Sequence, residues 1–364
     1  MLSIGIVGLP NVGKSTLFNA LTKKSVPTEN FPFCTIDPSV GVVAVPDPRL
    51  AQLSRLSKSD KAIPAAVQFI DIAGLVQGAS TGEGLGNQFL AHIREVDVIA
   101  HVVRVFDDPD IAHVHGEVDP AQDIEVVNLE LMMADLQTVS KRLSNIDKDI
   151  RGGDKGAQLE KEMLQKVSQQ LEKGKLIHDM SVIEQKNDVL RRLHLLTAKP
   201  MFYVLNKKSG GHNLDEMNDG RFEKCKEYFE ENNFSWIAID AGIEQELNDV
   251  SSEEKQSLRQ DLGAMDAGVD DLIRKGYDTL GLITFFTIGE KEIRGWTVKK
   301  DSTVREAGSA VHSDFRDKFI RAEVIHCDKL LEVGSYAKAR EQGLVRTEGK
   351  NYIVQDGDVI KFKI

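Results

Sequence analysis

The sequence predicts an α/β fold in which a mostly parallel sheet is covered by helices, interrupted by a helical hairpin and followed by a small α+β domain. Two observations support this fold class. Through residues 1–280, short apolar runs typical of buried strands alternate with helical or loop segments, and this alternation favours parallel strands joined by helices. The apolar spacing also changes twice, first to a heptad period and later to short alternating strands.

Five apolar runs are expected to form the sheet. The first, residues 3–8, leads directly into the loop Gly-Leu-Pro-Asn-Val-Gly and then into a helix that should start near Ser15. The other expected strands are residues 67–70, 98–103, 201–205 and 236–239. Because helical or loop segments separate these runs, mostly parallel pairing follows.

A helical hairpin is expected between the third and fourth of these strands. Apolar residues recur there at alternating steps of three and four, which predicts a three-heptad seam. The seam consists of Leu129, Met132, Leu136, Val139, Leu143, Ile146 and Ile150. Three glycines within residues 151–156 then break the helix, and a second stripe at Leu164, Val167 and Leu171 resumes it, so an antiparallel hairpin is the simplest fold. Such a projection usually meets a partner; a self-contained stabilising hairpin is the alternative.

The pattern changes divide the chain into three expected units. Residues 1–124 and 201–281 form a nucleotide-binding domain, residues 125–200 form an inserted helical coiled-coil domain, and residues 282–364 form a separate small domain. The last unit has about 80 residues, which suffice for a modest core of its own.

Composition excludes several classes of function. No stretch of about 20 apolar residues occurs and no secretory leader is recognisable, so a membrane is not expected as a partner. Three widely spaced cysteines fit neither a disulfide framework nor a zinc site, which favours a cytoplasmic location. The net charge of −11 argues against DNA binding. Residues 125–200 and 281–364 are slightly positive, so any contact with RNA would fall to them, although ordinary solvated faces explain this charge more simply.

Residues 8–15, Gly-Leu-Pro-Asn-Val-Gly-Lys-Ser, match the phosphate-binding P-loop in full, between a strand and a helix. The glycines let backbone N–H groups surround the β-phosphate, and the helix N-terminus adds its positive end. Lys14 reaches the β and γ oxygens and is therefore a candidate catalytic residue, while Ser15 ligates Mg²⁺.

Two further segments are expected to complete the metal and γ-phosphate site. Asp71-Ile72-Ala73-Gly74 ends an expected strand, where parallel sheets present their ligands. Asp71 would hold Mg²⁺ through a water molecule, and the Gly74 N–H would contact the γ-phosphate. Thr35, in the loop Asn-Phe-Pro-Phe-Cys-Thr, is the expected second hydroxyl ligand. Loss of the γ-phosphate would then release both segments, as in nucleotide switches.

The residues after the fourth strand favour ATP over GTP. A guanine-specific protein carries Asn-Lys-x-Asp there, and its aspartate accepts two hydrogen bonds from the base, whereas this chain has Ser209 at the last position of Asn206-Lys207-Lys208-Ser209. A serine hydroxyl cannot replace that acceptor. The Asn206 amide could instead pair with the donor and acceptor on an adenine edge. Residues 241–244 would form the other wall of the base pocket.

The residues leave two explanations open for the group that positions the attacking water. Leu75 stands where small switch GTPases have a glutamine. His113 or His115, in the polar loop 107–120, could polarise the water, with His113 preferred; that both are solvated loop residues is an equal alternative. By analogy alone, Asn11 is expected to contact a monovalent cation such as K⁺ near the phosphates.

The motifs together resemble the YchF group of Obg-like ATPases over the whole chain. The resemblance rests on Gly-Leu-Pro-Asn-Val-Gly-Lys-Ser-Thr, on the segments around Thr35 and residues 71–87, and on two C-terminal runs, residues 319–325 and the run from residue 348. It implies a GTPase-like nucleotide domain, an inserted coiled coil and a C-terminal TGS domain of the β-grasp type. It also implies ATP preference, Mg²⁺ dependence and ribosome association.

Carried over by position, the resemblance assigns nucleotide contacts to the residues from Asn11 through Val12, Gly13, Lys14 and Ser15 to Thr16. Ser15 and Thr35 match its Mg²⁺ ligands, Leu75 its replacement for the catalytic glutamine, and His113 a loop histidine that assists hydrolysis. Adenine recognition would involve Asn206 and the Lys207 backbone. Ser209 departs from the acidic residue that is common in the family at that place.

Three functions are consistent with the sequence. The first is an ATP-hydrolysing switch that docks on the ribosome or its large subunit through the hairpin and the TGS domain. The second is a GTPase of ribosome assembly. The third is a ribosome- or RNA-binding module whose nucleotide site only stabilises the fold, so that partner binding would not depend on Lys14.

Overall fold

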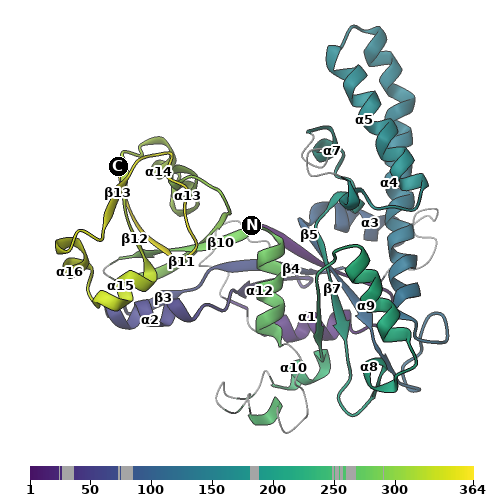
Figure 1. Ribbon diagram of the computed structural model, residues 1–364, viewed down its shortest axis with the longest axis horizontal. Coiled ribbons are helices and arrows are strands. Elements are labelled where there is room, and N and C mark those ends of the chain that lie inside the picture. Colours follow the sequence, from purple (N-terminus) through teal and green to yellow (C-terminus); the bar gives the residue numbers. More distant parts are fainter. Residues whose placement is uncertain are drawn as a thin grey trace.

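The computed structural model describes residues 1–23, 25–26, 37–72, 74, 85–180, 188–247, 250, 254, 257–259, 268–289 and 291–364. Two six-stranded sheets organise this part of the chain, and a helical hairpin projects from one of them (Figure 1). No helix in the described ranges is both long enough and apolar enough to cross a bilayer.

The first sheet has the strand order β2-β4-β1-β5-β7-β9. Its strands are β1 (Ser3–Val7), β2 (Val40–Ala44), β4 (Ala66–Asp71), β5 (Val98–Arg104), β7 (Met201–Asn206) and β9 (Trp236–Ile239). The five predicted strands are present and pair in parallel. The edge strand β2, which the sequence did not predict, pairs antiparallel with β4. β1, β5 and β7 are buried throughout, so this sheet forms the main core.

Helices cover this sheet, and one packs unusually close to it. They are α1 (Lys14–Thr22), α3 (Leu85–Glu95), α9 (Arg221–Glu231), α10 (Ala241–Leu247) and α12 (Val269–Thr279). α12 touches the sheet at Gly276, where a Cβ atom would lie 2.5 Å from Ile4 Cδ1. Short elements complete the unit: β6 (Phe106–Asp107), β8 (His212–Asn213), α7 (Asp188–Leu193), α8 (Leu214–Met217), and the 3-10 turns Ile177–Asp179 and Leu196–Ala198.

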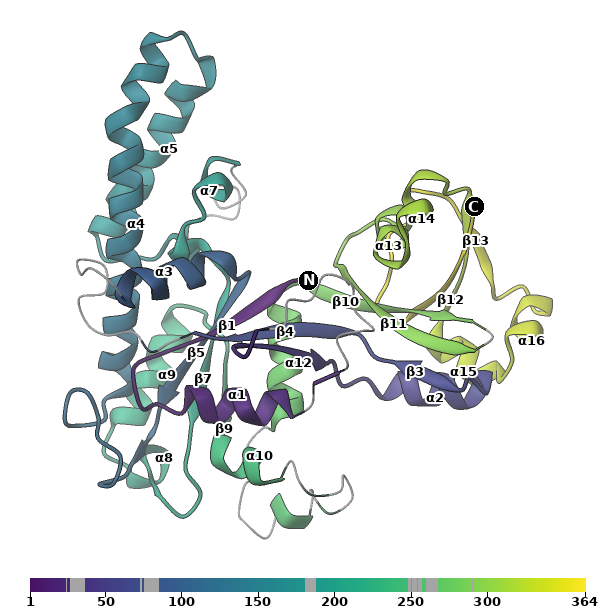
Figure 2. The same ribbon diagram turned by 180° about the vertical axis from the view of Figure 1, so that it is seen from behind.

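The predicted hairpin is present as two antiparallel helices, α4 (Pro120–Arg151) and α5 (Lys155–Glu172), which Figure 2 shows projecting beyond the sheet. α4 begins five residues before the predicted boundary, because the Asp119 side chain accepts hydrogen bonds from the N–H groups of Ala121 and Gln122 and caps the helix there. Arg142 joins the two helices through Glu160, with Nε and Oε1 2.5 Å apart.

The predicted seam is correct from Met132 outward, where that residue is buried, and wrong at Leu129. Val139 and Ile146 are fully buried against α5 residues such as Leu164. Leu129, however, is 53% exposed. At its base α4 packs through Ile124, Val127 and Leu131 against the sheet domain, so a different side of the helix is turned inward there than the heptad count implied.

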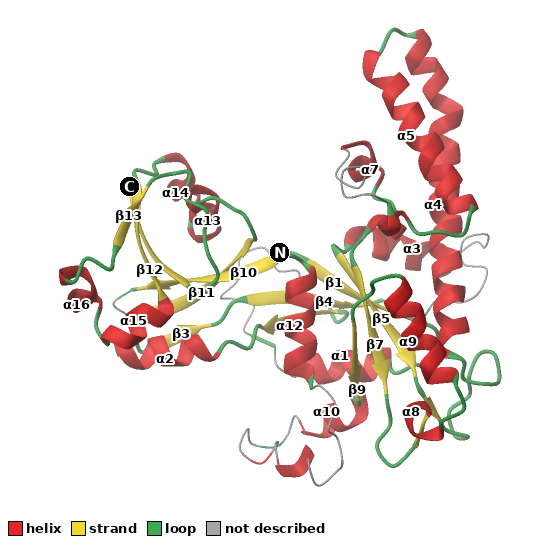
Figure 3. Ribbon diagram, viewed as in Figure 1, coloured by secondary structure: helices red, strands yellow, loops and turns green. Residues whose placement is uncertain are grey.

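The second sheet has the order β13-β12-β14-β10-β11-β3, and Figure 3 shows it beside the first. Its strands are β3 (Lys61–Ile63), β10 (Leu282–Ile288), β11 (Glu292–Lys299), β12 (Arg321–His326), β13 (Arg346–Glu348) and β14 (Asp358–Lys363). The associated helices are α2 (Pro48–Ser57), α13 (Val304–Val311), α14 (Ser313–Asp317), α15 (Cys327–Val333) and α16 (Tyr336–Glu341). That residues 282–364 constitute a TGS domain of the β-grasp type stays a prediction.

This second unit includes a piece of the N-terminal part of the chain, which the predicted boundary at residue 282 did not allow for. β3 pairs with β11 as an edge strand. On α2, Leu53 is fully buried in a cluster with Phe286 and Ile293. Residues 48–63 therefore belong with the C-terminal sheet because α2 buries Leu53 against it and β3 extends its edge through main-chain pairing. Ile63 of β3 packs instead with Val42 and Ala66 of the first sheet.

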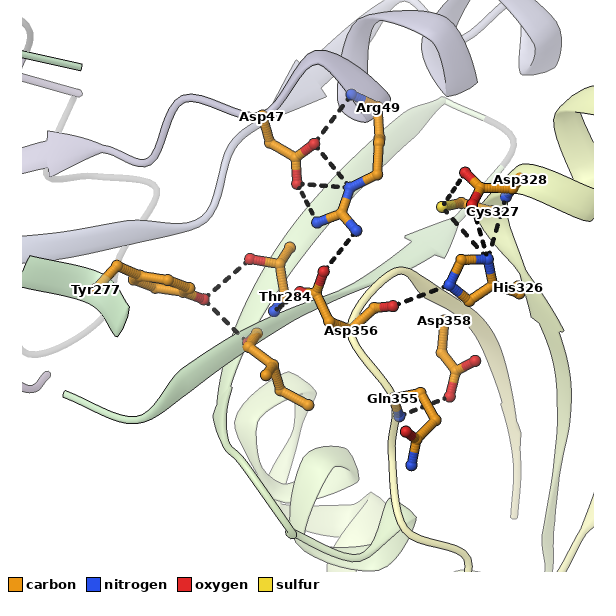
Figure 4. A network of polar contacts seen from close by, with 11 residues as sticks. Asp47, Arg49, Tyr277, Thr284, His326, Cys327, Asp328, Gln355, Asp356 and Asp358 are labelled. Atoms are coloured by element: carbon orange, nitrogen blue, oxygen red, sulfur yellow. Dashed lines mark hydrogen bonds and ion pairs between the residues drawn. The ribbon is translucent and has the colours of Figure 1, made fainter. Parts of the chain in front are cut away.

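A polar network ties the two units together (Figure 4). Arg49 donates to both carboxylate oxygens of Asp47 and, from Nη1, to Asp356 Oδ2 at 2.6 Å. The other oxygen of Asp356 accepts the Thr284 N–H, and the Tyr277 hydroxyl contacts the Thr284 hydroxyl. Arg49 thus links the start of α2 to the turn before β14, and Tyr277 links α12 to β10.

Candidate active site

The loop between β1 and α1 has a backbone that only certain residues can adopt. Asn11 and Gly13 have φ angles of 61° and 95°, in the left-handed region that glycine and asparagine tolerate best. A Cβ atom on Gly13 would also lie 2.2 Å from Asn206 Nδ2. Glycine is therefore required at position 13, where it also forms the N-cap of α1. The loop amides and the helix N-terminus together make an anion site.

Lys14 points back along this loop. Its ammonium group donates a hydrogen bond to the carbonyl of Leu9 at 2.7 Å, and the residue is 7% exposed. Burial lowers the pKa of Lys14 to about 8, although the negative charge of Asp71 acts in the opposite direction. An incoming phosphate would favour the protonated form, since it places negative charge beside the ammonium.

Ser15 and Asp71 lie together, as the predicted metal site requires. The Ser15 hydroxyl donates to Asp71 Oδ2 at 3.0 Å. A hydroxyl and a carboxylate at the edge of a phosphate loop are oxygen ligands of the kind that Mg²⁺ prefers, so these residues fit the metal. The third predicted ligand, Thr35, lies outside the residues that the structure describes.

Gly74, three residues after the end of β4, lies close to the lysine. A Cβ atom on Gly74 would lie 3.0 Å from Lys14 Nζ and 3.3 Å from the backbone nitrogen of Pro10. Only a residue without a side chain therefore fits comfortably at position 74. Leu75, the predicted substitute for a catalytic glutamine, lies outside the described residues.

A cavity of about 430 Å³ opens beside the loop. It is lined by Asn11, Gly13, Lys14, Ser15, Thr16, Phe106, Ile111, Asn206, Lys207, Lys208, Asp240 and Gly242. Seven of these were predicted nucleotide-binding residues. The eighth, Val12, is buried, and its carbonyl is engaged by Asn206. The structure thus brings the phosphate loop and the base-pocket segment to one cavity.

The role predicted for Asn206 needs correction. Its Nδ2 donates to the carbonyl of Val12 at 2.9 Å, and its Oδ1 accepts the N–H of Ala241 at 3.1 Å. The amide is 5% exposed, so it ties the P-loop to α10 and is not free to pair with adenine. The Lys207 N–H is also engaged, since it donates to the carbonyl of Ile239. A primary amide matches two backbone groups as well as it matches a base edge.

His113 lies where the hydrolysis hypothesis did not expect it. Its side chain is 2% exposed and its Nε2 is 3.0 Å from Asp123 Oδ2, in a pair buried between the loop and α4. It does not line the cavity. In this arrangement the imidazole anchors the loop rather than facing a water molecule. The adjacent carbonyl of Ala112 accepts a hydrogen bond from Asn11 Nδ2 at 3.2 Å, so the loop does contact the phosphate site.

Four cavity residues were missed: Phe106, Ile111, Lys208 and Asp240, whereas Gly242 lies in the predicted wall 241–244. All follow the carboxyl ends of β5, β7 or β9, where parallel sheets bind ligands, and this rule could have identified them.

Arg104 holds part of this wall in place. It is 1% exposed and donates to the carbonyls of Phe106, Ile111 and Asp108. The signal that could have revealed it is an arginine at the end of an apolar strand.

Comparison with known proteins is consistent with this geometry. A family model described as "50S ribosome-binding GTPase" matches residues 3–140, and the YchF-GTPase_C model, described as "Protein of unknown function (DUF933)", matches residues 282–364. The chain is 49% identical to the ribosome-binding ATPase YchF of Bacillus subtilis, covering all of this chain and 99% of that protein. It is 44% identical to the protein of the same name from Escherichia coli O157:H7, with 98% of each covered.

A solved structure agrees over the same length. The YchF GTPase of Schizosaccharomyces pombe has a TM-score of 0.87 and 36% identity, covering all of this chain and 97% of that one. Three observations lead to one conclusion. They are the P-loop fold, the contact between Ser15 and Asp71, and sequence similarity to named members over the full length of the chain. The chain belongs to the YchF family of P-loop nucleoside-triphosphate hydrolases.

Proposed function

We propose that this protein is an ATP-hydrolysing switch that binds the ribosome or its large subunit. The proposal rests on 49% sequence identity, over the full length of the chain, to a protein named ribosome-binding ATPase. It rests also on the geometry of the site, where Lys14, Ser15 and Asp71 lie together at one phosphate loop. Binding to ribosomes would place the protein in the cytoplasm.

Preference for ATP is supported by what the base pocket offers. Asp240 is the carboxylate among the described residues that line the cavity. Its Oδ2 accepts the Ser209 N–H, and its Oδ1 accepts the Ile243 N–H. These contacts hold the Asp240 carboxylate against the backbone of Ser209 and Ile243, and Ser209 supplies no carboxylate at the position where a guanine-specific protein carries one.

Ser15 would hold Mg²⁺ directly, Thr35 would join it when the triphosphate is bound, and Asp71 would act through a water molecule. The ion supplies neutralisation of the charge that develops on the phosphate oxygens. Lys14 adds a second positive charge on the side of Leu9, and the N-terminus of α1 a third. Asn11 would contact a monovalent cation such as K⁺ beside the phosphates and so allow K⁺ to stimulate hydrolysis.

Docking is assigned to the hairpin and the C-terminal unit. The hairpin projects from the nucleotide domain, and the C-terminal unit is linked to the nucleotide domain through Tyr277 of α12, whose hydroxyl contacts Thr284 of β10. A GTPase of ribosome assembly, or a ribosome- or RNA-binding module indifferent to hydrolysis, are the competing functions.

Calorimetry with Mg²⁺ tests the nucleotide. The affinities for non-hydrolysable ATP and GTP analogues are compared in the wild type and in a Ser209→Asp variant. ATP preference in the wild type, reduced in the variant, supports the proposal. GTP preference in the wild type contradicts it and favours an assembly GTPase.

Sedimentation with ribosomes tests the switch. The wild type should co-sediment to different extents with an ATP analogue and with ADP. Lys14→Ala should lose that difference. Equal co-sedimentation of both proteins in every nucleotide state would support the nucleotide-indifferent binding module instead.

A further inference from the structure

A second cavity, of about 700 Å³, lies at the base of the hairpin. We call it the base groove. α4 contributes Glu125, Asn128 and Leu129, the turn after α5 contributes Asp179, and α9 contributes Tyr228 and Glu231. Figure 1 shows α9 alongside the lower half of α4. None of these residues lines the nucleotide cavity.

The floor of the base groove holds a buried acceptor that the fold does not use. Asn128 is 4% exposed, and its Nδ2 donates to the Tyr228 hydroxyl at 3.0 Å. Its Oδ1 has no hydrogen-bond partner. Leaving a buried amide oxygen unpaired is destabilising, because the group loses its bonds to water and gains none in the fold, and native proteins rarely accept that cost without a reason. The oxygen has almost no accessible surface in this structure, so a donor in the groove would satisfy it once the amide turned toward the groove.

The rim of the base groove is acidic. Glu125, Asp179 and Glu231 lie on it, against one lysine, Lys175. Burial raises the pKa of Tyr228, and the negative charges of Asp179 and Glu125 raise it further, so both carboxylates act on the space around the phenol. The groove therefore attracts a cation and repels the phosphates of RNA.

An exposed apolar side chain lies next to these charges. Leu129 is 53% exposed, although it belongs to the heptad pattern of α4. A large exposed apolar side chain beside a polar cavity is typical of a docking site when other observations also indicate a ligand. Here the unpaired Asn128 oxygen supplies that second observation.

We propose that the base groove binds a basic, partly apolar peptide segment of a partner protein. An arginine of the segment lies against the Tyr228 ring, pairs with the rim carboxylates and donates an N–H to Asn128 Oδ1, while an apolar residue covers Leu129. Arginine fits better than lysine because its planar guanidinium stacks on aromatic rings and offers five donors in fixed directions. This inference is independent of the proposed nucleotide and ribosome functions.

Fluorescence anisotropy on the full chain tests the inference. The probe is a labelled decapeptide of alternating arginine, leucine and glycine; the same peptide with citrulline in place of arginine and a labelled uridine decanucleotide serve as comparisons. The arginine peptide should bind with an affinity that falls with salt, and the other two should bind at least about tenfold more weakly.

Variants then locate the binding site. Glu231→Gln should lower the affinity for the arginine peptide by about two- to fivefold, as expected when one charge on the rim is removed. Glu227→Gln, on an exposed position of the same helix that does not line the groove, is the matched control and should have no effect. Leu129→Ser should weaken binding by about tenfold through lost apolar contact.

Asn128→Leu separates recognition from folding. It removes the unpaired oxygen together with the amide, so thermal stability should change little, while the peptide should bind about tenfold more weakly. Unchanged peptide affinity in Asn128→Leu and Leu129→Ser would overturn the proposal. Equal binding of the citrulline peptide, or tighter binding of the oligonucleotide, would also overturn it. Concentration-dependent self-association that Leu129→Ser abolishes would identify a second copy as the occupant instead.

Discussion

Replacing Asn206 by alanine should weaken the fold and leave nucleotide preference unchanged. The side chain satisfies the carbonyl of Val12 and the N–H of Ala241, and both groups would lose their partner. Each orphaned buried group costs about 1–3 kcal/mol. Because the site borders an open cavity, water can reach one of them, so a loss of about 2–4 kcal/mol in the free energy of unfolding is expected. Asn206→Asp keeps the acceptor for Ala241 and should lie between the alanine variant and the wild type.

The assay uses the two tryptophans of the chain. Trp236 is in β9 next to β7, and Trp296 is in β11 of the second sheet. In a Trp296→Phe background, urea unfolding followed by fluorescence reports on the sheet that contains Asn206. Affinities for ATP and GTP analogues are then measured in the folded range. Both should fall by a similar factor, because the P-loop is displaced for either nucleotide.

A different result would refute this reasoning. If Asn206 reads adenine, the alanine variant should lose ATP affinity selectively, its GTP affinity should remain, and its stability should change by less than about 0.5 kcal/mol. That outcome would mean that the two backbone contacts are incidental and that the amide turns toward the base when nucleotide binds.

Three other predictions follow from the site and the junction. Lys14 has a pKa of about 8 in the free protein, and a bound phosphate raises it, so above pH 8 nucleotide binding should take up a proton and its affinity should fall by up to about tenfold per pH unit. Calorimetry at pH 8.5 in two buffers of different ionisation enthalpy should show this proton uptake, and an absence of uptake would contradict the electrostatic argument. His113→Gln and Asp123→Asn should reduce turnover by similar factors and be non-additive in the double variant, because they break one buried pair; a loss confined to His113→Gln would show that the imidazole acts on the water. Arg49→Ala should destabilise the second sheet by only about 1–2 kcal/mol, because its partner Asp356 is half exposed. Trp296 fluorescence during urea unfolding in a Trp236→Phe background measures this loss of stability, and Arg49→Lys should recover less than half of it. An unchanged unfolding midpoint in Arg49→Ala would contradict the role of Arg49.

The parts of the structure that the sequence predicted are those with a local signal. The P-loop occurs between its strand and helix, and the five parallel strands occur within one or two residues of the expected ranges, because apolar runs and helix starts depend on neighbouring residues. The outer half of the hairpin follows its heptads for the same reason.

The errors arose where distant parts of the chain meet. Leu129 occupies a heptad position that predicts burial, but tertiary packing at the base of α4 decides which side of the helix faces inward and leaves this residue exposed. The partners of Asn206 and His113 are Val12 and Asp123, and no spacing rule shows that these residues are in contact. Polar side chains able to bind a ligand are equally able to bind the backbone, so residue type alone could not assign their roles.

The pairing of β3 with β11 has a consequence for synthesis of the chain. Lys61 pairs with Glu292, 231 positions later. At roughly 5–20 residues per second, that interval lasts about 10–50 s on a translating ribosome. During this time α2 has no surface on which to bury Leu53, although the nucleotide domain around it is being completed. Expression of residues 282–364 alone creates the complementary problem, because the edge of β11 and the apolar side of Phe286 and Ile293 are left uncovered. Fragments cut at residue 282 should therefore aggregate, and a soluble C-terminal unit needs residues 48–63 supplied in the same polypeptide.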